Sequence, residues 1–238
     1  MHKEYKCRIL EIDGARNVRD LGGYKVHGGW TSYGRFLRSG QLSSLSDLGV
    51  QQLLEAGVDC VVDLRSRFEC ESKPSCIGAK QGVDVFYVPM LDFIHSEIAQ
   101  GLAKLPESLE EIYLAIIEKG QQDFKQLFEI FAADYNCILF HCTAGKDRTG
   151  ISAMLLLWLA GVGEETILED YSYSYELNRL KAVEGIPEYL LYSDKSTLKL
   201  AIDTLKQQYG GVLQYLSAAG VTGEQQAAIR KKLVDIRE

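Results

Sequence analysis

The stretch ILFHCTAGKDRTGISAMLLLWLAG, residues 138–161, holds two apolar runs separated by a polar loop. The first run, from Cys137 to Phe140, is short and sharply bounded, which predicts a buried strand. The second, from Thr149 to Ala160, is long enough for a helix, and Gly161 stands where a C-terminal cap is expected. The polar loop therefore joins the end of a strand to the beginning of a helix.

A loop of this kind favours an anion. Small residues such as Ala144 and Gly145 allow successive backbone N–H groups to converge, and the helix N-terminus adds the positive end of its dipole. Arg148 closes the loop, where its planar fork can hold two phosphate oxygens at once. The sequence therefore predicts a phosphate-binding loop.

Cys142 places a thiol in the same loop. Cations and a helix N-terminus favour the ionised thiolate, which is a good nucleophile for phosphorus. The five residues between Cys142 and Arg148 are enough to wrap one tetrahedral group, and Thr149 is placed to donate its hydroxyl to the sulfur. A buried structural cysteine with a surface arginine would show the same bare spacing, but the flanking strand and helix favour in-line attack, a phosphoenzyme and hydrolysis by water.

The rest of the chain alternates strand and helix patterns. Strands are predicted at Arg8–Ile12, Tyr24–Val26, Arg35–Arg38, Cys60–Leu64 and Val83–Val88. Helices are predicted from Ser46, a candidate cap, to Gly57, at 106–119, at 121–134 and through most of 164–238, with breaks near Gly185–Pro187, Gly210–Gly211 and Gly220–Gly223. This order indicates an α/β protein with at least part of its sheet parallel.

Composition favours one domain over residues 1–238, because 46% of the residues are hydrophobic and no linker divides the chain. The net charge of −7 argues against nucleic-acid binding but permits a locally positive pocket.

The six cysteines are scattered without zinc spacing, so neither a metal nor a cofactor is expected. No transmembrane segment and no leader are visible, so we expect a cytoplasmic protein, or a secreted one if a leader has been removed.

Three ordered motifs carry a family resemblance: NVRDLGGY (17–24), VVDLRS (61–66) and HCTAGKDRTG (141–150). The last resembles the signature loop of the cysteine-dependent protein-tyrosine-phosphatase superfamily. Together they resemble its atypical bacterial branch, which includes mycobacterial and listerial lipid-and-tyrosine phosphatases, over roughly residues 10–165. The resemblance implies a central, mostly parallel mixed sheet flanked by helices, with additional helices after the loop. It also implies catalytic roles for Cys142 and Arg148 and phosphate binding by Thr143, Ala144, Gly145, Lys146 and Thr149.

Three carboxylates compete for the role of general acid toward the leaving oxygen. Asp147 lies inside the loop, where a bound phosphate would disfavour its ionisation, and it resembles the loop aspartate of myotubularin-like and Sac-type phosphatases. Asp92 follows a strand, much as the mobile acid does in dual-specificity relatives. Asp63 ends a strand beside Arg65 and is equally suited to an ion pair. We favour Asp147, and we expect His141 to orient the cysteine rather than to transfer protons.

The substrate class follows from the loop and from the resemblance. Lys146 gives the loop a second cation, as in lipid phosphatases that act on inositol rings, so both phosphotyrosine and phosphoinositides are implied, with phosphoserine and phosphothreonine open. Residues 164–192 are either a helical lid or a helix pair packed on the core, and 193–238 are C-terminal helices. Peripheral contact with a membrane stays open. The alternative is a non-catalytic phosphate-recognition module of the same fold, against which the presence of both Cys142 and Arg148 argues.

Overall fold

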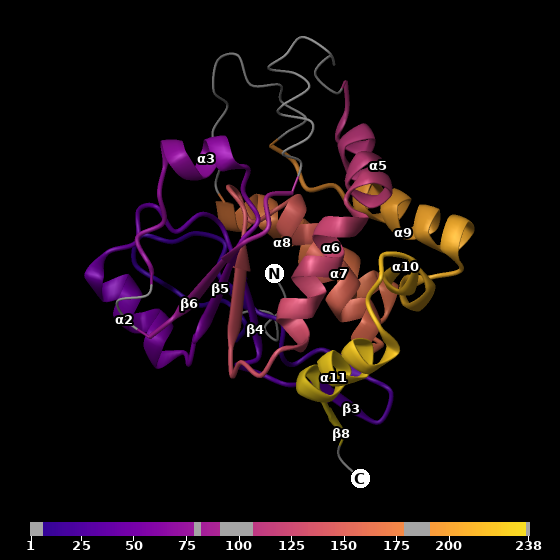
Figure 1. Ribbon diagram of the computed structural model, residues 1–238, viewed down its shortest axis with the longest axis horizontal. Coiled ribbons are helices and arrows are strands. Elements are labelled where there is room, and N and C mark those ends of the chain that lie inside the picture. Colours follow the sequence, from indigo (N-terminus) through magenta and orange to yellow (C-terminus); the bar gives the residue numbers. More distant parts are fainter. Residues whose placement is uncertain (1–6, 79–81, 91–106, 179–190, 237–238) are drawn as a thin grey trace.

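Five strands form the central sheet, in the order β1-β4-β7-β5-β6. Figure 1 labels β4, β5 and β6 of this sheet. In the computed structural model, which describes residues 7–78, 82–90, 107–178 and 191–236, β1 runs antiparallel to β4, and β4, β7, β5 and β6 are parallel. The strands are β1 Arg19–Asp20, β4 Phe36–Ser39, β5 Cys60–Asp63, β6 Asp84–Tyr87 and β7 Ile138–His141. The prediction of a mostly parallel mixed sheet is confirmed.

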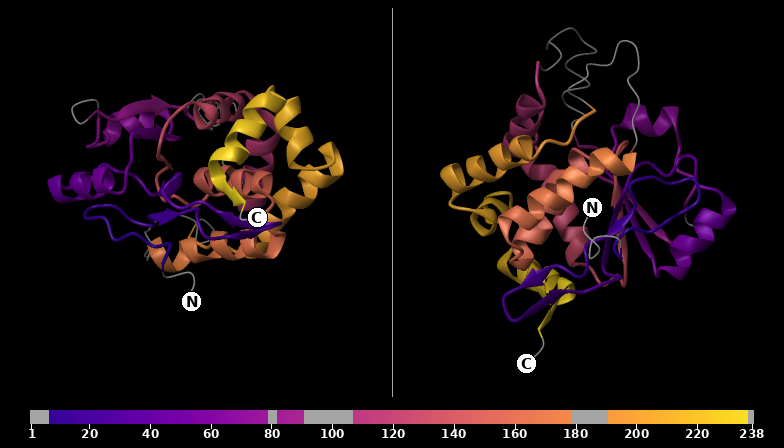
Figure 2. Two further views of the ribbon diagram at one scale, coloured as in Figure 1. Left: turned by 90° about the horizontal axis from the view of Figure 1, so that it is seen from below. Right: turned by 180° about the vertical axis from the view of Figure 1, so that it is seen from behind.

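Helices cover both faces of this sheet (Figures 1 and 2). They are α2 Asp47–Glu55, α3 Arg67–Ser72, α5 Leu109–Lys119, α6 Gln121–Ala132, α7 Arg148–Ala160, α8 Glu164–Asn178, α9 Lys195–Tyr209, α10 Val212–Ala218 and α11 Gly223–Leu233. Side chains alternate between the two faces because successive strand residues point to opposite sides. Leu37, Val61 and Leu139 belong to a core with residues of α2, whereas Phe36, Val62 and Phe140 belong to the larger core with α5 to α11.

Helix α7 lies at the centre of the larger core. All but two of its residues are buried, so its apolar side chains occupy every face rather than one stripe. The helix ends as predicted at Gly161, which adopts the left-handed conformation with φ of 92°. The strand before it and the loop between them also lie where the sequence predicts.

Two predictions of local structure are wrong at the chain's edges. Residues Arg8–Ile12 form no strand; only Ile9 makes an isolated bridge, to Arg19. The C-terminal segment ends in a strand, β8 Val234–Ile236, which pairs with β3 Gly29–Thr31 and extends a small sheet begun by β2 Lys25–Val26. In both cases, whether a strand forms depends on a pairing segment that lies elsewhere in the sequence. The break expected near Gly185–Pro187 and part of the expected lid lie outside the described residues.

A buried ion triad joins the central sheet to α8. Asp170 of α8 binds Arg19 of β1 through Nε and Oδ1 at 3.0 Å and Arg38 of β4 through Nη1 and Oδ2 at 2.5 Å. Tyr24 donates a further hydrogen bond to Asp170 Oδ1 at 2.8 Å, and Ser174 accepts one from Arg19 at 3.0 Å. The three charged side chains are at most 2% exposed, so their geometry is protected from water.

These contacts set the ionisation of Asp170. Burial alone would raise the pKa of this carboxyl, but Arg19, Arg38 and Tyr24 outweigh it and lower the pKa from 3.8 to about 2. The folded protein therefore binds a proton at Asp170 more weakly than the unfolded chain does. The resulting stabilisation is complete above about pH 4 and is lost as the pH falls toward 2.

We predict that Asp170→Asn lowers the free energy of unfolding at pH 7 by about 3–5 kcal/mol, because it leaves two buried arginines without their carboxylate. Urea unfolding measured from pH 7 to pH 2 checks this. The parent should also lose stability below pH 4 through this group, by on the order of 2 kcal/mol in full, and the variant should not.

The control is Asp203→Asn, which breaks an exposed pair with Lys199 and should change stability by less than about 1 kcal/mol. If Asp170→Asn behaved like this control, the triad would not be a major source of stability.

Candidate active site

The carboxyl ends of the parallel strands meet at one edge of the sheet, where α7 begins (Figure 1). Residues Cys142–Asp147 form the loop between β7 and α7. The segments that follow β4 and β5 begin at the same edge, because β4, β5 and β7 all run in the same direction. In α/β sheets, ligands bind at such an edge.

The loop turns three successive carbonyl groups toward the neighbouring strand ends. The Thr143 carbonyl accepts a hydrogen bond from the Gln41 amide at 3.0 Å, and Asn17 Nδ2 donates to the carbonyls of Ala144 and Gly145, each at 3.0 Å. In a trans peptide the following N–H points away from the carbonyl. The next three amides, those of Ala144, Gly145 and Lys146, are therefore directed to the opposite side of the loop. We call these three amides the cradle; that they bind an anion stays a prediction.

Close backbone packing requires glycine at position 145. Gly145 has φ of 65°, and a Cβ atom there would lie 2.3 Å from the carbonyl oxygen of Ser39. Its own carbonyl accepts a hydrogen bond from Arg38 Nη2 at 2.9 Å, which connects the loop to the buried triad. Asn17 is also in the left-handed region, with φ of 58°, a conformation that Asn tolerates better than most residues. Asn17 and Arg38 are loop-holding residues that we did not predict.

Cys142 follows β7 directly and is 2% exposed. The preceding His141 is fully buried, with Nδ1 3.3 Å from the Cys142 carbonyl oxygen and Nε2 3.7 Å from Asp63 Oδ2. Burial lowers the pKa of His141, which favours a neutral ring. The histidine thus contacts the cysteine's backbone; its orienting role stays a prediction. Thr149 Oγ1 is buried and has no hydrogen-bond partner among the described residues.

Arg148 holds a carboxylate of the protein itself. Its Nη1 and Nη2 atoms bind the two carboxylate oxygens of Glu69 at 2.6 and 2.8 Å, and Thr143 Oγ1 also donates to Glu69. Burial alone would raise the pKa of Glu69, but these hydrogen bonds hold it far below its usual range. We did not predict this contact. The signal available was the capping box of α3, in which Ser66 and Glu69 bind each other's backbone amides.

Asp147 lies beside the loop's second cation. The Tyr113 hydroxyl donates to Asp147 Oδ1 at 2.8 Å, and Lys146 Nζ lies 3.3 Å from the same oxygen. The Asp147 side chain is 26% exposed, whereas Lys146 is buried and donates to the Tyr192 carbonyl at 2.6 Å. Lys146 therefore connects the loop to the segment before α9, and its role in substrate binding stays a prediction.

The other two acid candidates differ from Asp147. Asp63 is buried and forms a two-point ion pair with Arg65, through Nε at 2.9 Å and Nη2 at 2.7 Å. Burial opposes the ionisation of Asp63, but the hydrogen bonds from Arg65 prevail and lower its pKa. This geometry is that of a structural ion pair. Asp92 lies outside the described residues.

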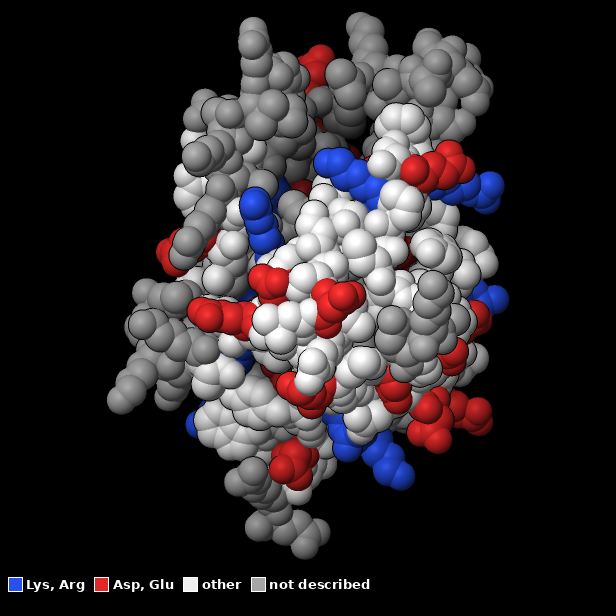
Figure 3. Space-filling model, turned by 90° about the vertical axis from the view of Figure 1, so that its left-hand side faces the viewer, with Lys and Arg blue, Asp and Glu red and all other residues white. Residues whose placement is uncertain are grey.

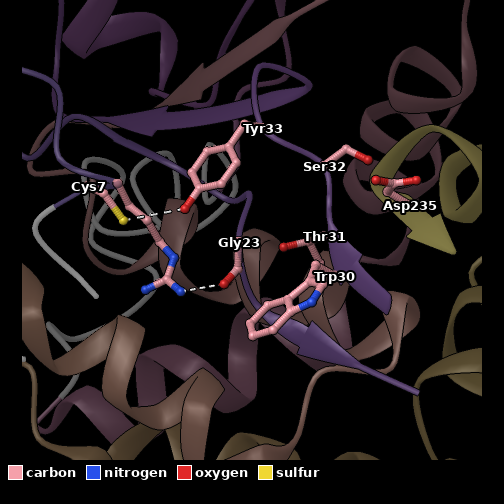
Figure 4. A pocket seen from close by; sticks show the side chains of 8 residues that line it. Cys7, Gly23, Trp30, Thr31, Ser32, Tyr33 and Asp235 are labelled. Atoms are coloured by element: carbon pink, nitrogen blue, oxygen red, sulfur yellow. Dashed lines mark hydrogen bonds between the residues drawn. The ribbon is translucent and has the colours of Figure 1, made fainter. Parts of the chain in front are cut away.

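Two other parts of the described surface differ from the loop. A pocket of about 470 Å³ lies over the small sheet, lined by Trp30 and Tyr33 with Cys7 and Asp235 (Figure 4), and no loop residue lines it. The face in Figure 3 carries interspersed acidic and basic side chains. Among the described residues, no cluster of three or more His, Cys, Asp or Glu is arranged to hold a metal, and no helix has the length and apolar character needed to span a membrane.

We predict that Gly145→Ala destabilises the protein by at least about 2 kcal/mol and abolishes stabilisation by inorganic phosphate, because the methyl group displaces the loop from β4. Gly161→Ala is the matched control. Gly161 also has a positive φ, but a Cβ there meets nothing within 4 Å, so only the backbone strain of about 1 kcal/mol applies. Urea unfolding with and without phosphate measures both effects. Equal losses in the two variants would contradict the close packing at Gly145.

The chain is similar in sequence to known phosphatases. A tyrosine-protein phosphatase of Nostoc commune is 36% identical over 58% of this chain and 48% of its own length. A putative tyrosine-protein phosphatase of Cupriavidus necator is 32% identical over 71% of this chain and 64% of its own length. The match therefore spans about half of the first relative and under two thirds of the second. The triple specificity protein phosphatase PtpB of Mycobacterium tuberculosis is 25% identical over 90% of this chain and 95% of its length.

Among solved structures, that of P. aeruginosa TpbA covers 84% of this chain and 97% of its own, with 14% identity and a TM-score of 0.38. The match to the family as a whole covers more of this chain than the matches to the first two relatives do. The family model described as the tyrosine phosphatase family matches residues 10–235. Because this match takes in nearly the whole chain, including all three motifs, the protein belongs to the tyrosine phosphatase family.

Proposed function

We propose that the protein is a cysteine-dependent phosphatase that hydrolyses phosphate monoesters, phosphotyrosine foremost, through a phosphocysteine intermediate. The observation that carries the proposal is the loop itself: its carbonyls are turned toward Asn17, Arg38 and Gln41, which leaves its amides for an anion next to Cys142. Family membership and the names of the relatives support the same reaction.

In the first step the Cys142 thiolate attacks phosphorus. A sulfur–phosphorus bond forms as the ester oxygen departs, and Asp147 gives its proton to that oxygen. The loop amides stabilise the charge on the three remaining oxygens, and Arg148 adds to this through the N–H groups that do not bind Glu69. Glu69 holds the Arg148 fork in place through two hydrogen bonds.

In the second step a water molecule attacks the phosphocysteine. Asp147, now ionised, accepts a proton from this water, and the sulfur–phosphorus bond breaks to release phosphate and the thiolate. Thr149 supports the departure of the sulfur by donating its hydroxyl, which has no other partner among the described residues.

Phosphoinositides are the second substrate class we propose, and Lys146 is the reason. Its ammonium group donates to the neutral carbonyl of Tyr192 at 2.6 Å. A second phosphate on an inositol ring would offer a charged acceptor in its place, and charge-assisted hydrogen bonds are stronger than neutral ones. Comparison of kcat/KM for phosphotyrosine, phosphoserine and phosphothreonine peptides and for phosphoinositides ranks these substrates.

We predict that Cys142→Ser lowers kcat by more than about 10³, because a serine hydroxyl is protonated at neutral pH and lacks a base to activate it. The variant should remain folded and should still bind inorganic phosphate, which distinguishes loss of the nucleophile from loss of the site. Steady-state turnover of para-nitrophenyl phosphate is the measurement. Cys76→Ser, at an exposed cysteine, should keep the parent's rate. Turnover by Cys142→Ser within tenfold of the parent would exclude Cys142 as the nucleophile and would favour another mechanism.

We predict that Asp147→Asn lowers kcat by about 10²–10⁴ for an alkyl phosphate, whose leaving oxygen needs a proton. The loss should be much smaller for para-nitrophenyl phosphate, whose leaving group departs readily as an anion. The comparison variant is Asp92→Asn, which should show no such dependence on the leaving group. The opposite pattern would assign the general acid to Asp92.

A further inference from the structure

Asp147 occupies the N-cap position of α7 without capping the helix. Aspartate at this position ordinarily accepts hydrogen bonds from the first helical amides. Here its side chain makes no such bond. A carboxylate that capped α7 would occupy the site where the same amides are to meet phosphate. Some other contact must therefore hold the Asp147 carboxylate away from the cradle.

Tyr113 of α5 provides that contact. Its hydroxyl donates to Asp147 Oδ1 at 2.8 Å, and Lys146 Nζ approaches the same oxygen at 3.3 Å. Within the described part of the chain, no hydrogen bond to Asp147 Oδ2 accompanies these two. Because Oδ1 already faces two donors, a proton on this carboxyl belongs on Oδ2.

The donor is itself held in a fixed position. Tyr113 is fully buried, and its hydroxyl lies 2.7 Å from that of Tyr171 on α8. The two rings meet edge to face, with centroids 6.1 Å apart. Burial, followed by the nearby Asp147, raises the pKa of Tyr113 well above its usual value, so the phenol remains a donor throughout the working range of pH.

We propose that Tyr113 is the positioning residue of the general acid, holding Asp147 Oδ1 away from the phosphate cradle and directing the transferable proton to Oδ2. This inference rests on the proposed role of Asp147. The charged and titratable groups around the pair are Lys146 and Arg148 in the loop and Tyr171 on α8, with Arg38 and Asp194 near Tyr171.

The test is Tyr113→Phe, which removes one oxygen and keeps the ring. Because the acid is no longer directed, kcat for an alkyl phosphate should fall roughly tenfold at unchanged KM, with little change for para-nitrophenyl phosphate.

The matched control is Tyr215→Phe. Tyr215 is also fully buried, and its hydroxyl donates to the Ile117 carbonyl at 2.9 Å, so this variant loses a buried hydrogen bond that does not involve Asp147. It should leave KM and the dependence of kcat on the leaving group unchanged. Equal effects of the two substitutions on both substrates would reduce Tyr113 to a structural role and overturn the inference.

A double-mutant cycle separates this inference from the proposed function. In the Asp147→Asn background, Tyr113→Phe should have no further leaving-group-dependent effect. If the loss of kcat in Asp147→Asn depends on the leaving group and Tyr113→Phe leaves kcat unchanged, the positioning role is wrong and the general-acid assignment stands. If the loss in Asp147→Asn does not depend on the leaving group, the general-acid assignment itself is wrong. Should Tyr113→Phe not fold, Tyr171→Phe takes its place, because its hydroxyl contacts that of Tyr113. This variant should lower kcat for the alkyl phosphate to a smaller extent, and an unchanged kcat would overturn the inference.

Discussion

The carboxylate of Asp170 is the centre on which the site depends. It pairs with two buried arginines from β1 and β4, and one of these, Arg38, binds the Gly145 carbonyl. Arg19 in turn donates to the side chain of Asn17, which holds the adjacent loop carbonyls. A single buried network thus extends from α8 through the sheet to the phosphate loop. Because removing any buried charge leaves its partners uncompensated, this network constrains the loop's conformation.

Two carboxylates lie beside the proposed anion site, and each is held by a specific donor. Glu69 is bound by the fork of Arg148, and Asp147 is bound by Tyr113. Without such partners, a nearby carboxylate would compete with phosphate for the amides at the helix N-terminus. In this acidic protein, the proposed anion site therefore depends on directed hydrogen bonds as well as on the two loop cations.

Local signals in the sequence were sufficient for most of the fold. The strand before Cys142, the long apolar helix after Arg148 and the glycine cap at Gly161 depend on residues close together in the chain, and all three were predicted. The terminal strand Val234–Ile236 was not, because its partner Gly29–Thr31 lies at the other end of the sequence. The same limit explains the error at Arg8–Ile12, where strand-like composition meets only one bridging partner.

The sequence by itself determined which residues form the loop and predicted its chemistry, since Cys142, Gly145 and Arg148 lie within one short segment whose spacing matches a known family. The tertiary structure alone decided which side chains hold that loop. Asp170 is 132 positions from Arg38, Glu69 is 79 from Arg148, and Tyr113 is 34 from Asp147. None of these pairs leaves a periodic or local pattern in the sequence, because each contact forms only when the parallel sheet and its helices bring distant segments to one edge.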